Sequence, residues 1–115
     1  VLMDIKKPVT LTDSASGLPV IVSPGIVEVV ERNIDGAQLH VWSRELIRVS
    51  ESVLEVSALV YGEAPTVIGT NSRGDAMWCI GLDRFAYAVG RADGGFSVKV
   101  HGTAVSGLRA DRLSY

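Results

Sequence analysis

Short apolar runs, rich in β-branched residues and separated by turn residues, fill the first half of the chain. Asp35-Gly36 lies between two of these runs and predicts a hairpin, because Gly adopts a positive φ without steric cost. Leu39 and Val41 alternate with polar residues, as in a strand with one buried face. The pattern predicts strands over residues 9–12, 18–23, 26–32, 37–43 and 46–49.

The spacing of apolar residues changes after these strands. Valines at i, i+3 and i+7 from position 53 predict a short helix over residues 52–61, packed on the sheet. Ser52 and Glu55 have the spacing of a capping box, which satisfies two otherwise unpaired backbone donors. Gly62 is well placed to end the helix, and Pro65 prevents its continuation.

The second half of the chain is richer in Gly and has longer turns. Its clearest hairpin alternates large and small residues, with Phe85, Tyr87 and Val89 on the face expected to lie on a core. We see no internal repeat in the sequence. The expected elements are a polar loop at 70–75, a strand at 76–82, a hairpin of 85–90 with 96–101, and an irregular tail over 102–115.

These elements predict a mainly β fold of the β-rich α+β class. We expect an antiparallel meander or a small, partly closed barrel of about seven to nine short strands, with one short helix. The length of 115 residues indicates a single domain over 1–115. Within it we expect a β-meander plus helix over 9–61, a β-hairpin extension over 66–101 and the tail.

The composition of the chain excludes few classes of function. A net charge of -2 lacks the basic face that nucleic-acid binding by phosphate neutralisation requires, so we expect no nucleic-acid partner. The N-terminal VLMDIKKP lacks the layout of a signal peptide, and no apolar run reaches the roughly 20 residues of a membrane span. We therefore expect a cytoplasmic location or a place within a larger assembly. Met3 is a candidate native start, which leaves the origin of Val1 and Leu2 open.

Side chains capable of catalysis are sparse. Cys79, His40 and His101 are the only thiol and imidazole groups of the sequence, and a Cys–His pair could act as a nucleophile. Cys79 lies between Trp78 and Ile80, where a buried and inert thiol is the usual outcome. The sequence has no close ligand pair of the Cys-x-x-Cys or His-x-x-x-His type. We therefore expect no catalytic residue, no metal and no cofactor.

Other candidate motifs have ordinary structural explanations. Arg73-Gly74-Asp75 spells the tripeptide that integrins recognise, but Gly and Asp at these positions also predict a turn. The aromatic residues could stack on single-stranded nucleic acid, yet few positive residues lie near them, so core packing is preferred. The carboxylates are spread over strands and turns without a distinguished pair: Glu28, Glu31, Asp35, Glu45, Glu51, Glu55 and Glu63.

An ordered series of residues runs through positions 9–60. It consists of Leu11-Thr12, Gly17, Pro24, Ile26-Val27 with Glu28 and Glu31, Asp35-Gly36, Ile47-Arg48-Val49 and 51–56. This order resembles short flagellar-operon proteins of the FlbD/SwrD kind, and similar modules of phage and prophage proteins. The chain departs from the pattern at Ser43-Arg44-Glu45 and continues well beyond the point where those proteins stop. The resemblance implies an assembly or accessory role without catalytic residues.

A two-sided apolar pattern in the central hairpin predicts an interaction surface. Alternation places His40 and Trp42 on the face opposite Leu39, and Val27 and Val29 on one face of their strand. A single helix can cover only one face of such a sheet, and an exposed apolar patch usually marks a partner surface. We therefore expect a homo-oligomer or a stable hetero-complex.

The leading functional hypothesis is a non-enzymatic assembly or accessory protein that acts through protein–protein contacts. The alternative is a phage or prophage protein, either a structural component of the virion or a small inhibitor of a host enzyme. A distant third is an enzyme that uses Cys79 with a histidine.

Overall fold

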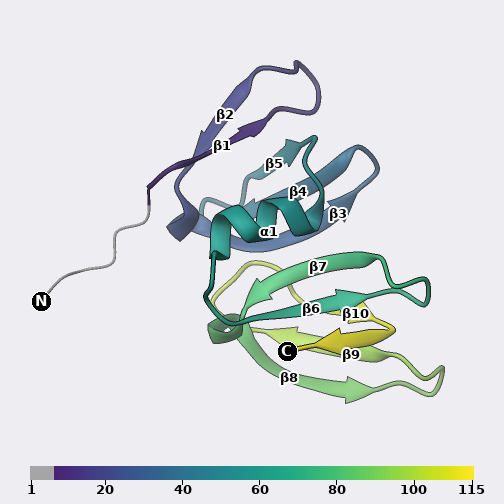
Figure 1. Cartoon of the computed structure of the whole chain (residues 1–115). Coiled ribbons are helices and arrows are strands. Elements are labelled where there is room, and N and C mark those ends of the chain that lie inside the picture. Colours follow the sequence, from purple (N-terminus) through teal and green to yellow (C-terminus); the bar gives the residue numbers. More distant parts are fainter. Residues whose placement is uncertain (1–6) are drawn as a thin grey trace, which may run out of the picture.

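The structure, a computed structural model, describes residues 7–115. The sequence-based expectation for Met3, with Val1 and Leu2, therefore lies outside the described residues. Eleven strands, one α-helix and two 3₁₀ turns form over the described part of the chain (Figure 1). The first half contains β1 (Val9–Thr12), β2 (Pro19–Val22), the turn η1 (Pro24–Ile26), β3 (Val27–Asn33), β4 (Gly36–Val41), β5 (Leu46–Val49) and α1 (Val53–Tyr61). The second half contains β6 (Thr66–Thr70), β7 (Ala76–Gly81), the turn η2 (Leu82–Arg84), β8 (Phe85–Gly90), β9 (Phe96–Val100), β10 (Leu108–Ala110) and β11 (Arg112–Ser114).

The strands form three antiparallel sheets. A six-stranded sheet has the order β11-β6-β7-β3-β4-β5, a three-stranded sheet has the order β10-β9-β8, and β1 pairs with β2. The predicted mainly β fold with one short helix is confirmed, and the sheets are open, so the fold is not a closed barrel. Two corrections follow. The tail over 102–115 is not irregular, since it supplies β10 and β11, and the strands outnumber the predicted seven to nine.

The six-stranded sheet is covered on both faces. On one face, α1 and the β1–β2 hairpin enclose a layer formed by Leu11, Val22, Val27, Val30, Ala37, Leu39, Val41, Val49, Val53, Val56, Val60 and Cys79. On the other, the three-stranded sheet encloses Val29, Val67, Trp78, Ile80, Val98, Val100, Leu108 and Ala110. The sequence argument that only one face could be covered is therefore wrong, because β8, β9 and β10 supply a second cover.

Helix α1 begins and ends where the sequence predicts. The Glu55 backbone N–H donates to Ser52 Oγ at 3.2 Å, and the Ser52 N–H donates to Glu55 Oε1 at 3.3 Å. This reciprocal pair is the predicted capping box. Gly62 ends the helix with a φ of 57°, in the region that favours glycine.

The β-bulges in β3 and β8 shift the alternation of side chains. The β3–β4 register slips between Val27 and Val29, so Val27 faces the helix-side layer and Val29 faces the opposite one. A second slip follows Phe85 in β8, and Tyr87 consequently points to solvent although Phe85 packs on the core. The predicted common face of Phe85, Tyr87 and Val89 is therefore wrong.

The order of elements repeats within the chain. We call β1 to β5 (residues 9–49) unit 1 and β6 to β10 (residues 66–110) unit 2. Each unit runs as a hairpin, a 3₁₀ turn, a second hairpin that begins with a bulge, and a short last strand. The polar loop of the first hairpin is capped by its first residue in both, Asp13 in unit 1 and Asn71 in unit 2.

Corresponding backbone hydrogen bonds close both units. After the last strand, the Ser50 N–H donates to Thr12 O at 2.9 Å in unit 1, and the Asp111 N–H donates to Thr70 O at 2.8 Å in unit 2. The order of elements therefore repeats in the structure, although we see no repeat in the sequence. The predicted boundary after residue 61 falls between the units, but β6 and β7 belong to the same sheet as β3, β4 and β5.

Candidate functional site

The four residues of the predicted interaction surface have different environments. Val27 and Val29 are buried on opposite faces of β3, so neither lies on the surface, and their assignment to it is wrong. His40 is partly buried, and its Nε2 lies 2.9 Å from Glu31 Oε1. Trp42, after the end of β4, is 73% exposed. The expected apolar patch is therefore reduced to Trp42 at the end of a hairpin.

Three other exposed apolar side chains lie on two strands at sheet edges. Among residues 7–115, β2 pairs only with β1, and β8 pairs only with β9, so each strand has one unpaired edge. Ile21 on β2 is 71% exposed, and on β8 Tyr87 and Val89 are 56% and 55% exposed. An unpaired strand edge offers backbone N–H and C=O groups to another chain. These two edges are the candidate functional site.

Both edges lack the charged side chains that often prevent association. Native edge strands are usually protected by charged side chains, especially Lys. No charged residue occurs in β2 or in β8. Pro19 is the one protective residue on β2, and it stands at the first position of the strand. The β8 edge was not expected from the sequence, because the alternation pattern assigned Tyr87 and Val89 to the core.

A cleft of about 580 Å³ lies where η1, the end of α1 and η2 meet. Glu28 is the extra residue of the β3 bulge, and its side chain is 10% exposed. Arg84 Nη1 lies 3.7 Å from Glu28 Oε2 and also contacts the Gly102 carbonyl. Glu28 belongs to unit 1 and Arg84 to unit 2, so this ion pair joins the two units.

The residues considered for Cys–His chemistry are not brought together. Cys79 is buried in the helix-side layer, and burial raises the pKa of its thiol. His40 contacts Glu31 on the other face of the sheet, and His101 is exposed after β9. Within the described part of the chain, no group of three His, Cys, Asp or Glu side chains is placed to hold a metal ion.

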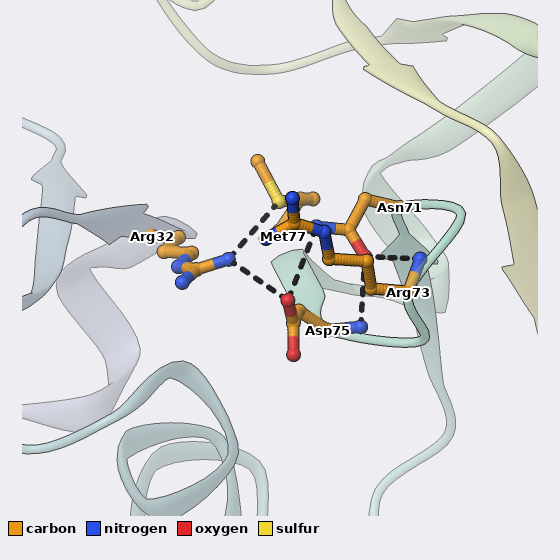
Figure 2. A network of polar contacts seen from close by, with 5 residues as sticks. All are labelled: Arg32, Asn71, Arg73, Asp75 and Met77. Atoms are coloured by element: carbon orange, nitrogen blue, oxygen red, sulfur yellow. Dashed lines mark hydrogen bonds and ion pairs between the residues drawn. The ribbon is translucent and has the colours of Figure 1, made fainter.

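The Arg73-Gly74-Asp75 segment forms a turn tied to β3 (Figure 2). Asn71 Oδ1 accepts hydrogen bonds from the Arg73 N–H at 3.0 Å and the Asp75 N–H at 2.9 Å. The Asp75 carboxylate contacts Arg32 Nη1 at 3.4 Å and Asn71 Nδ2 at 3.3 Å. The predicted turn is confirmed, and its carboxylate is occupied by contacts that fix the unit 2 loop to β3.

Comparisons with known proteins do not assign the chain to a family. No family model matches it, and searches of curated proteins and of solved structures found no match. The resemblance to short flagellar proteins therefore stays a prediction. Within residues 7–115, no helix has the length and apolar character that crossing a membrane demands.

Proposed function

We propose that this chain is a non-enzymatic assembly component that acts through protein–protein contacts at its two open sheet edges. One observation supports the proposal most strongly. Both layers of the core are enclosed within the chain, yet β2 and β8 keep unpaired edges with exposed apolar side chains and no charge. Such edges are aggregation sites unless they have a partner, so a chain that keeps them uses them for binding.

The resemblance suggests two kinds of assembly, the flagellum and the virion, and both are built from repeating protein–protein contacts. A flagellar accessory protein and a structural component of a virion would each use strand edges to join neighbouring subunits. Identifying the genes that neighbour this one would distinguish a flagellar protein from a phage protein.

Capture from the native host tests the proposal. The unmodified chain, Ile21→Lys and Val89→Lys serve as baits, since a lysine blocks each edge without disturbing the core. Ile34→Lys is the matched control, because Ile34 is 95% exposed in the β3–β4 turn, away from both edges. We expect the bound proteins, which include the chain itself, to be retained by the control and lost in the edge variants. Equal capture by all four baits would contradict the proposal.

A separate experiment tests the enzymatic alternative. Because Cys79 is buried and its thiol pKa is raised, iodoacetamide should modify it far more slowly in the folded chain than in denaturant. Rapid alkylation of the folded chain at neutral pH would revive the hypothesis of a thiol enzyme.

A further inference from the structure

We propose that the occupant of the β8 edge is β2 of a second copy of this chain, paired in the register that β3 and β7 use within the chain. The proposal rests on the proposed function and names its partner. It follows from the internal repeat, because the chain already contains one example of the contact.

The existing contact joins the two units edge to edge. Strand β3 of unit 1 pairs antiparallel with β7 of unit 2, with Val30 opposite Cys79 and Glu31 opposite Trp78. Strand β3 starts the second hairpin of its unit, and β7 ends the first hairpin of its own. The remaining strands in these two roles are β8 and β2. Both have an open edge, as does β11 at the end of the six-stranded sheet, which has neither role.

The repeat fixes the register of the proposed pair. Each second hairpin begins directly after a 3₁₀ turn, so Val27 at the start of β3 corresponds to Phe85 at the start of β8. Three residues further along each strand, Val30 in β3 corresponds to Ala88 in β8. Each first hairpin ends shortly before its 3₁₀ turn, so Cys79 in β7 corresponds to Ile21 in β2. Ala88 therefore lies opposite Ile21 of the next copy, with Val89 opposite Val20 beside it.

The backbone N–H and C=O groups of the two proposed partners, Ile21 and Ala88, point to the open edges of their strands. In an antiparallel ladder, successive residues turn their N–H and C=O groups alternately toward and away from one neighbour. The Asp13 N–H donates to Leu18 O at 2.8 Å, which directs the groups of Val20 to β1 and those of Ile21 to the open edge.

The same alternation applies to β8. The Arg91 N–H donates to Gly95 O at 2.7 Å, which directs the groups of Val89 to β9 and those of Ala88 to the open edge. Ala88 and Ile21 can therefore exchange two backbone hydrogen bonds, as the corresponding positions of β3 and β7 are placed to do. Pro19, which lacks an N–H, lies outside this two-residue ladder.

The side chains beside the proposed contact are compatible with it. In the internal junction, Glu28 and Arg84 form an ion pair next to the strands. The corresponding positions on the free edges are Ala86 and Ile26, so an apolar contact replaces the ion pair and no charge is left unpaired. Figure 1 shows β2 and β8 at opposite ends of the molecule. A contact between different surfaces at opposite ends is heterologous and generates a ring or an open filament.

Disulfide trapping between two variants tests the pairing. Ile21→Cys and Ala88→Cys are mixed under a mild oxidant, since Cα atoms of a hydrogen-bonded antiparallel pair are about 5.5 Å apart, within the range of disulfides. We expect a cross-linked heterodimer as the main product of the mixture and little cross-linking of either variant alone. The unmodified chain controls for buried Cys79, and Ile34→Cys mixed with Ala88→Cys controls for random collisions.

Other outcomes overturn this proposal in distinguishable ways. Cross-linking of Ile21→Cys with itself would show a two-fold β2–β2 contact, and the proposed function would stand with a different geometry. If no cross-link forms but Ile21→Lys abolishes capture of proteins from the host, the β2 edge binds a different protein and not a second copy of this chain. No cross-link and no effect of Ile21→Lys on capture would refute both proposals.

Discussion

A side chain added at position 69 would collide with Trp78. A Cβ on Gly69 would lie 2.2 Å from the indole ring, whose Nε1 donates to the Arg109 carbonyl at 2.8 Å. The indole thus bridges β7 and β10, and it has no room to move because it is buried. Small-to-large changes in packed cores usually destabilise by about 1–3 kcal/mol.

We therefore predict that Gly69→Ala lowers the free energy of unfolding by about 1–3 kcal/mol in urea denaturation. Gly25→Ala is the control, because nothing lies within 4 Å of a Cβ at that position. Equal stability of the two variants would contradict the packing of Trp78 described above.

Two buried groups predict a loss of stability in alkali. Burial raises the pKa of both the Cys79 thiol and the Tyr61 phenol above their ordinary values. A group whose pKa is higher in the folded than in the unfolded state makes its full contribution to the free energy of unfolding below its unfolded-state pKa. That contribution is lost as the pH rises through its folded-state pKa. The free energy of unfolding should therefore decline from about pH 8.5, where unfolded Cys ionises, and more steeply above about pH 10, where Tyr does. Tyr61→Phe should remove only the second decline, and an unchanged pH profile would refute the role of Tyr61.

At the scale of elements, the cap of α1 is the feature most directly read from the sequence. Ser52 Oγ accepts from the Glu55 N–H, and Glu51 next to it accepts from the Thr12 N–H and Oγ, both at 2.9 Å. The start of the helix is thus tied to β1. We predict that Ser52→Ala lowers the free energy of unfolding by about 1 kcal/mol, measured by thermal or chemical denaturation. Ser43→Ala, in the exposed turn after β4, should have an effect within error. A neutral Ser52→Ala would mean that the cap does not hold the helix.

The same scale shows which parts of the fold the sequence could predict. Capping residues, the Asp35-Gly36 turn and period-two alternation act within a few residues, and each correctly indicated its element. Bulges depend on pairing with a distant strand, so nothing local marked Glu28 as the extra residue of β3. Without that extra residue, the alternation placed Val27 and Val29 on one face, whereas they lie on opposite faces. The corresponding error in β8 hid the exposure of Tyr87 and with it the candidate site.

The whole molecule is a tandem of two similar units, and this repeat could not be recognised in the sequence. Similar backbone paths are built from different residues, since the two units bury different side chains at related positions. The first unit uses a charged residue, Glu28, where the second has Ala86. The repeat bears on the proposed function because it leaves one unpaired edge of each type, on β2 and on β8, at opposite ends of the molecule (Figure 1).

Sedimentation velocity over a concentration series tests the central account most directly. If β8 of one copy binds β2 of the next, the average mass of the unmodified chain should rise with concentration beyond that of a dimer. Ile21→Lys should remain a monomer under the same conditions, and Ile34→Lys should behave like the unmodified chain. A single monomeric species at every concentration, or an association that Ile21→Lys leaves intact, would contradict the account.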